Sequence, residues 1–167
     1  PYVDWREYQG PDYRDFPLHP YRFHPDDIAT PDDNGLLLQV PATVGFLQRN
    51  FKRCQQITKA IETPMCRKLR LKGLLYRSKL LNKVWLSPEQ ADAANMIKLA
   101  EQVRAQGVPV LNMSLHSTTL KAGLSPFVHD TDGEKKFIKL IEDFLAQVIN
   151  HYCTSMLLKE TASISRN

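Results

Sequence analysis

Apolar residues recur every three to four positions in two stretches of the chain. The first stretch lies between Ser87 and Gly107, and its apolar positions are Ala93, Met96, Ile97, Ala100 and Val103. This spacing puts the side chains on one face of a helix. The run Ser-Pro-Glu-Gln at 87–90 is typical of a helix start with Ser as N-cap, and Gly107 is typical of a helix end. We therefore predict a helix between these two residues.

The second stretch runs from about Asp132 to Tyr152. Its apolar stripe consists of Phe137, Leu140, Ile141, Phe144, Leu145, Val148 and Tyr152. We predict a long amphipathic helix here, with Thr131 or Asp132 as its cap and Asp130 as a further candidate. Residues 160–167 end in a polar run and are predicted to form a flexible tail.

Two short apolar runs have the character of strands. Residues 36–40, Leu-Leu-Leu-Gln-Val, follow the turn signal Asn34-Gly35 and form a continuous rather than alternating apolar run, as in buried parallel strands. Residues 108–115 form a second run directly after Gly107. Helix, glycine and strand in this order make one step of an alternating architecture. We predict an α/β fold with parallel strands around 36–40 and 109–115.

The middle of the chain, residues 46–83, is basic and rich in leucine. We predict two helices there, with a break near Thr63-Pro64. The chain has a net charge of +4, and most of its positive excess sits in this segment, so nucleic-acid binding has to be considered. The cations surround a leucine-rich pattern without interleaved aromatic residues, and no known nucleic-acid-binding motif is present. A solvated helix surface explains the pattern more simply, and we expect no nucleic-acid partner.

Residues 1–35 are rich in proline, aspartate and aromatic residues. Regular structure should be short there, but a flexible linker would not carry so many aromatic side chains. We predict a long ordered loop that borders a binding site. Its aromatic residues could stack on sugar rings and its arginines could hold charged substituents; the candidates are Tyr2, Trp5, Tyr21, Arg6, Arg14 and Arg22. The alternative is that these residues only cover one end of the domain.

Length and composition suit one globular domain of 167 residues. No apolar run is long enough for a membrane helix, so we expect no membrane partner. The first residues resemble neither a signal peptide nor a native start, which indicates a part of a larger protein. The cysteines, Cys54, Cys66 and Cys153, form no CxxC pair, and we expect reduced thiols in a cytoplasmic protein.

His116 is the main candidate for chemistry. It closes the predicted strand 109–115, and loops after strand ends form the active sites of α/β barrels and open sheets. Histidine can donate or accept a proton near neutral pH. Neighbouring hydroxyls could orient its ring; they belong to Ser114, Ser117, Thr118 and Thr119. A structural histidine at a strand end remains the alternative.

Three segments resemble one known family in the same order. They are DWREYQGPDYRDFPLHPYRF, GLLLQVPATVGF and NMSLHSTTLKAGLSPFV, the last followed by the Phe- and Leu-rich helix. They are similar to NodB-type polysaccharide deacetylases, and most similar to the WalW-like subgroup. The resemblance is strongest in residues 1–46 and 108–150, and it corresponds to the C-terminal portion of a distorted (β/α) barrel.

This resemblance implies hydrolytic removal of N-acetyl groups from a glycan in a bacterial cell-envelope pathway, with a divalent metal, usually zinc, as cofactor. The family's closing Leu-His motif falls on Leu115 and His116. Leu115 would line a pocket for the acetyl methyl group. His116 would be the general acid that protonates the leaving amine.

The sequence departs from the family at the metal site. The aspartate motif and the histidine pair that bind the metal would both lie before residue 1, and the chain has no H-x-x-x-H. His19 and His24 are five residues apart, and solvated loop histidines are the favoured interpretation; we assign no metal ligand. A partial barrel exposes strand edges. We therefore expect the missing N-terminal half or a second copy of the chain as partner.

Two hypotheses on function follow. The first is a piece of a metal-dependent glycan deacetylase. The second is a glycan-binding barrel fragment without catalysis, which holds its ligand with the aromatic loop. A basic nucleic-acid-binding domain is the weaker third reading, and salt-sensitive binding to generic DNA would support it.

Overall fold

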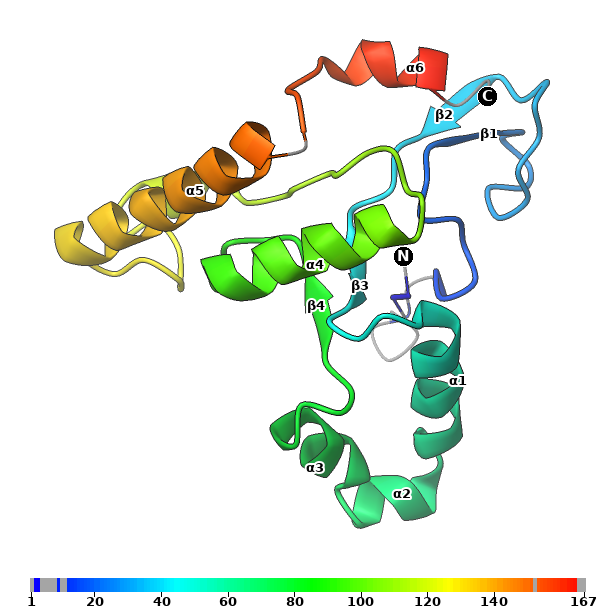
Figure 1. The fold of residues 1–167 in the computed structure, drawn as a ribbon, viewed down its shortest axis with the longest axis horizontal. Coiled ribbons are helices and arrows are strands. Elements are labelled where there is room, and N and C mark those ends of the chain that lie inside the picture. Colours follow the sequence, from blue (N-terminus) through cyan, green and yellow to red (C-terminus); the bar gives the residue numbers. More distant parts are fainter. Residues whose placement is uncertain (1, 4–8, 10–11, 152, 165–167) are drawn as a thin grey trace.

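The computed structural model describes residues 2–3, 9, 12–151 and 153–164, and leaves out the side chain of residue 67. Helices combine with two small sheets, which confirms a mixed α/β protein in the broad sense (Figure 1). The described residues do not form a closed barrel. The elements are β1 (Tyr21–Phe23), β2 (Leu37–Gln39), β3 (Val44–Phe46), α1 (Phe51–Ile61), α2 (Pro64–Lys68), α3 (Leu71–Arg77), β4 (Lys83–Trp85), α4 (Ala93–Ala105), the 3₁₀ helix η2 (Ser117–Leu120), α5 (Thr131–His151), the 3₁₀ helix η3 (Leu158–Glu160) and α6 (Thr161–Ile164).

Both sheets are antiparallel pairs, so the prediction of parallel strands is wrong for the described residues. Strand β1 pairs with β2 and β3 pairs with β4. The strand predicted at 36–40 is present as β2, but Leu36 and Leu37 are 77% and 47% exposed rather than buried. A run of leucines cannot specify its partner strand. Here Gly35 lets the chain pass so close to Phe23 that a Cβ would lie 2.5 Å from the Phe23 nitrogen, and the two segments form a hairpin-like pair.

The strand predicted at 109–115 is extended chain without a ladder. Pro109 has no N–H to donate. The N–H of Asn112 donates to the Thr43 side-chain oxygen at 2.8 Å, and the Thr43 N–H donates to the Asn112 carbonyl at 3.1 Å. The Ser114 N–H donates to the Leu86 carbonyl at 3.2 Å. The segment is thus attached to the β3–β4 pair at a few points, and a side-chain oxygen replaces one of the backbone acceptors of a regular sheet.

The helices follow the sequence pattern more closely, with corrections at their starts. Helix α4 begins six residues after the predicted cap, because the Asp92 carboxylate accepts the Asn95 N–H at 2.8 Å and Asp92 is the N-cap. Residues 87–90 form a turn instead. Of the three predicted cap candidates for α5, Asp130 is the one observed, because its carboxylate accepts the Gly133 N–H at 2.7 Å.

Two local signals are confirmed. Gly107 ends α4 with a φ of 77°, in the left-handed region that glycine adopts without steric cost. The helical middle is broken at Thr63-Pro64, although it contains three helices rather than two. The predicted tail includes the short helix α6, and its last three residues, 165–167, lie outside the described chain.

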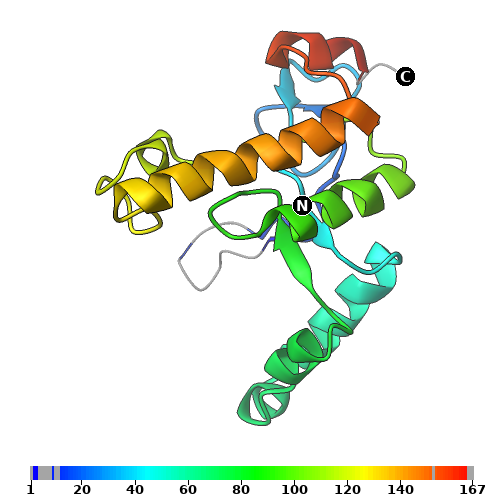
Figure 2. The same cartoon turned by 60° about the vertical axis from the view of Figure 1, so that its left-hand side comes forward.

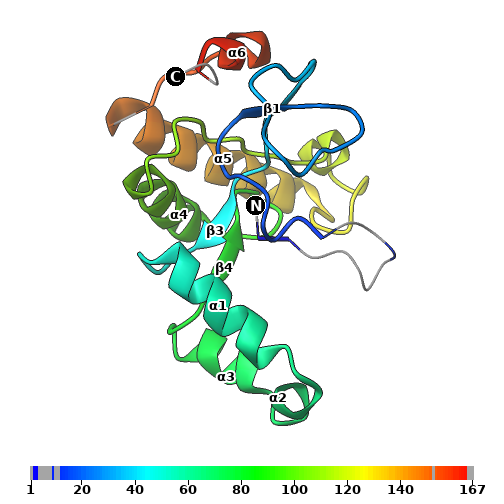
Figure 3. The same cartoon turned by 90° about the vertical axis from the view of Figure 1, so that its right-hand side faces the viewer.

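The core lies where α4 packs against the β3–β4 pair on one side and α5 on the other (Figures 1 and 2). Its most deeply buried side chains are Phe46, Phe51, Leu86, Met96, Leu99 and Val103. Gly45 allows the close approach of this layer, because a Cβ there would lie 2.6 Å from the Phe51 ring and 3.0 Å from the Leu99 side chain. Helices α1, α2 and α3 extend away from this core (Figure 3).

Candidate functional site

Three polar groups converge on the carboxylate of Glu89. The His116 ring nitrogen Nδ1 lies 2.8 Å from Glu89 Oε2, and the His116 backbone N–H donates to Oε1 at 2.8 Å. The Thr119 hydroxyl donates to the same Oε1 at 2.6 Å. Both carboxylate oxygens are therefore engaged by the segment that begins at His116. Thr119, which the sequence suggested as a partner of the ring, binds the carboxylate instead.

Glu89 and His116 differ in their exposure to solvent. The Glu89 side chain is 4% exposed and the His116 side chain is 77% exposed. Because Nδ1 faces Glu89, Nε2 is the ring nitrogen available to a bound molecule. The arrangement is a solvent-facing imidazole that is oriented by a buried carboxylate.

The electrostatics of Glu89 favour its ionised form. Burial raises the pKa of the Glu89 carboxyl, but this effect is outweighed by hydrogen bonds from the Thr119 hydroxyl, the His116 N–H and the His116 ring, and by the charge of the ring. The net result is a pKa below the ordinary value of a glutamate. The ionised Glu89 carboxylate can therefore accept all three hydrogen bonds from His116 and Thr119.

Two tight turns bring Glu89 and His116 together. Glu89 lies in the turn after β4, where the Gln90 N–H donates to the Ser87 carbonyl at 3.1 Å. His116 precedes η2, and the Thr119 N–H donates to the His116 carbonyl at 2.9 Å. The bond from Ser114 to Leu86 described above ties the two segments together. The sequence singles out His116, whereas Glu89 stands only in a predicted helix start. No local pattern links two residues 27 positions apart.

A shallow recess of about 280 Å³ opens beside the exposed imidazole. It is lined by His116, Thr118, Thr119, Leu124, Ser125, Pro126 and Phe127. Leu124 and Phe127 supply exposed apolar surface there, at 63% and 50% exposure. Leu115 is half-buried and is not among the lining residues, so its role at an acetyl group stays a prediction.

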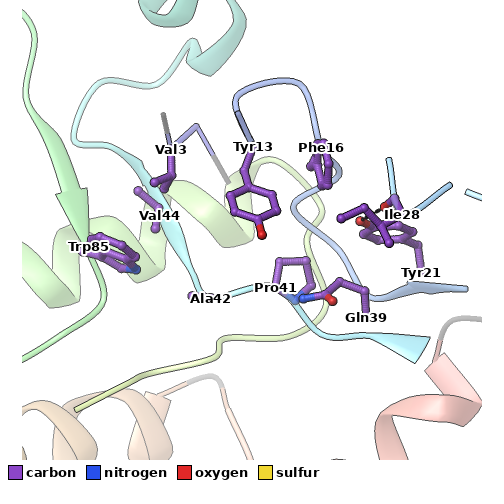
Figure 4. A pocket seen from close by; sticks show the side chains of 10 residues that line it. All are labelled: Val3, Tyr13, Phe16, Tyr21, Ile28, Gln39, Pro41, Ala42, Val44 and Trp85. Carbon is purple, nitrogen blue, oxygen red and sulfur yellow. Dashed lines mark hydrogen bonds between the residues drawn. The ribbon is translucent and has the colours of Figure 1, made fainter. Parts of the chain in front are cut away.

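A second pocket, of about 240 Å³, is lined by aromatic side chains of the opening loop and of the strands (Figure 4). Tyr13, Phe16 and Tyr21 stand on one side, while Trp85 lies at the far end and Gln39 at the base. The Tyr21 hydroxyl donates to the Ile28 carbonyl at 2.8 Å, which fixes its ring. Of the aromatic residues predicted to bind substrate, Tyr21 lines this pocket, and its binding role stays a prediction.

The other residues predicted to bind substrate lie elsewhere. Tyr2 packs against Phe46 and Phe51, with ring centroids 5.3 and 5.9 Å apart. Arg22 donates to the Gly35 carbonyl at 3.2 Å. Arg14 pairs with Asp12 and Glu62 at 2.6 and 2.7 Å, and so ties the loop to α1. Trp5 and Arg6 lie outside the described residues.

The part of the chain that the structure describes contains no set of residues that could bind a metal ion. No group of three or more His, Cys, Asp or Glu side chains converges there. His24 approaches only its neighbour Asp26 in an exposed turn, at 3.2 Å. The zinc that the resemblance implies therefore has no complete ligand set among the described residues. Among the described residues, no helix has the length and apolar character needed to cross a membrane.

An apolar groove of about 470 Å³ runs between residues 109–113, α5 and the segment 153–156. Met113, Leu145 and Ile149 are among its lining residues. Leu145 and Ile149 remain 38% and 48% exposed. The unpaired side of the extended segment 109–115 thus adjoins an uncovered apolar surface.

Comparison of the chain with protein-family models, with curated proteins and with solved structures finds no match. The resemblance to polysaccharide deacetylases therefore rests on the quoted sequence segments alone.

Proposed function

We propose that this chain is the C-terminal portion of a NodB-type polysaccharide-deacetylase barrel and that His116 is its proton donor in the hydrolytic N-deacetylation of a glycan. The observation that carries the proposal is the exposed imidazole held at Nδ1 by the buried Glu89 carboxylate. The sequence segments that resemble the family supply the substrate class. The geometry alone supports proton transfer in a shallow, partly apolar recess.

The proton transfer follows from the geometry. In its cationic form His116 carries a proton on each ring nitrogen, and Glu89 stabilises that charge through Nδ1. After water has added to the acetyl carbonyl carbon, the C–N bond breaks and the acetyl group leaves as acetate. Nε2 gives its proton to the departing amine nitrogen. The neutral ring keeps its Nδ1 proton and donates it in a hydrogen bond to Glu89. Nε2 later regains a proton from solvent. Such general acid catalysis contributes about 10² to 10⁴-fold to a rate.

The described residues provide no set of ligands for the metal of this reaction. In the proposal its ligands come from the N-terminal half of the barrel, on polypeptide outside this sequence. The groove beside residues 109–113 supports such a partner, because Leu145 and Ile149 on its wall are still partly exposed.

Acetate release tests the proposal. The longest natural polypeptide that contains this sequence is incubated with an N-acetylglucosamine oligomer, as wild type and as His116→Ala. We expect kcat to fall by about 10² to 10⁴-fold in a variant that still folds, as circular dichroism would show. His129→Ala, a change at another exposed histidine, is the matched control and should leave turnover unaffected. Normal turnover by His116→Ala would exclude the general-acid role.

The aromatic pocket favours glycan binding without catalysis as the second candidate. Aromatic rings with one amide, Gln39, suit the apolar face and hydroxyls of a sugar ring. If the natural protein releases no acetate but binds the oligomer, and Phe16→Ala weakens that binding while His116→Ala does not, this second function replaces the first.

A further inference from the structure

Residues 63–80, which include α2 and α3, form a segment that we call the basic arm. It contains six lysines and arginines and no aspartate or glutamate. The five cations whose side chains are described are all exposed, and they are Lys68, Arg70, Lys72, Arg77 and Lys79. None of them takes part in the ion pairs formed between described residues. The positive charge of the arm is therefore open to solvent.

The arm also exposes its large apolar side chains. Five of them are between 57% and 71% exposed, namely Met65, Leu69, Leu74, Tyr76 and Leu80. Helix α3 has no buried residue at all. The arm lies beyond α1, away from α4 and α5 (Figures 1 and 3), and these five side chains keep more than half of their surface open to solvent.

This combination calls for a partner that is both anionic and apolar. A surface that is only hydrated would not be expected to expose several leucines. Clustered exposed apolar side chains mark interaction sites. A second copy docked arm to arm would bring its own excess of cations to the same surface, and like charges repel. Nucleic acid would use the cations but not the leucines, and Tyr76 is the single aromatic residue available for stacking in the arm.

We propose that the basic arm docks on the surface of an anionic lipid bilayer. Its lysines and arginines meet the lipid headgroups, and its leucines and Met65 enter the region where headgroups and acyl chains meet. The proposal goes beyond the deacetylase function and does not depend on it. It revises the expectation from sequence that the chain has no membrane partner, because that expectation concerned spanning segments, and docking at the surface needs none.

Co-sedimentation with vesicles tests the proposal. The 167-residue chain is mixed with phosphatidylcholine vesicles, or with vesicles of phosphatidylcholine and phosphatidylglycerol in equal parts. We expect binding only to the second kind, weakened by salt. The triple variant Lys68→Gln/Lys72→Gln/Lys79→Gln should bind on the order of 100-fold more weakly, since each cation near an anionic surface contributes about fivefold.

Two further variants make the test specific. The control Lys98→Gln/Lys135→Gln/Lys159→Gln removes three exposed lysines outside the arm, and it should retain binding to within a few-fold. Leu69→Ser/Leu74→Ser keeps every charge and should weaken vesicle binding by on the order of tenfold, because apolar burial contributes separately. The fold of each variant is checked by circular dichroism.

Several results would overturn the proposal. One is the absence of binding to the anionic vesicles, and another is an equal loss in the control variant. A third is vesicle binding that the leucine variant leaves unchanged, which would indicate charge attraction alone. Binding to a DNA duplex that is tighter than vesicle binding would identify nucleic acid as the partner instead. Self-association that masks the arm would identify a second copy.

Discussion

The Glu89–His116 site and the basic arm differ in the environment of their charged groups. At the site a single carboxylate is buried, receives three hydrogen bonds and orients one exposed imidazole. In the arm the cations stand in solvent beside exposed leucines. The first arrangement is preorganised, so one substitution should disturb it measurably. The second relies on many weak contributions, and a single substitution in the arm should have little effect on the stability of the fold.

The same contrast holds for packing, and two glycines allow a matched comparison. Gly45 lies in the core, where a Cβ would meet the Phe51 ring at 2.6 Å, while a Cβ at Gly73 in α3 would meet nothing within 4 Å. We expect Gly45→Ala to destabilise the fold by about 1–3 kcal/mol, as overpacking does. Gly73→Ala should instead stabilise it by about 0.5–1 kcal/mol, because alanine is the better helix former.

Urea unfolding of the two variants measures both effects. Opposite signs would confirm that the core around β3 is closely packed and that the arm is solvated. If Gly73→Ala destabilised the protein as much as Gly45→Ala, the arm would be packed against something, and its exposed leucines would need another explanation.

A smaller effect should appear in the pH dependence of stability. The pKa of the Glu89 carboxyl is lowered in the folded protein, so the ionised group stabilises the fold above the unfolded value of about 4.3. That contribution is lost as the pH falls through the folded-state pKa. Wild type should therefore lose its stability advantage over Glu89→Gln as the pH is lowered from neutral. A stability difference that does not change with pH would contradict the inferred charge at Glu89.

Sequence reasoning succeeded where the signal is local. The stripe of α5, the break at Thr63-Pro64 and the stop at Gly107 depend on residues within a turn or two of one another, and the structure contains all three. The helix starts were less accurate, because Ser87 and Asp92 are both good caps and only the position of the chain after β4 decides between them.

Prediction from sequence is wrong or incomplete where the structure depends on contacts between distant segments. The partner of β2 is decided by the close approach of Gly35 to Phe23, which no periodicity contains. The site shows the same limit. His116 could be singled out by its place at the end of an apolar run, but Glu89 acquires its role only when the turn after β4 meets the start of η2.

The most direct test of the Glu89–His116 arrangement is the ring tautomer of His116, measured by ¹⁵N NMR at a pH where the imidazole is neutral. We predict that the neutral ring carries its proton on Nδ1, toward Glu89, and that Glu89→Gln weakens this preference. The other four histidines serve as internal references. A His116 ring protonated mainly on Nε2 in the wild-type chain would contradict the arrangement, and with it the proposed proton donor.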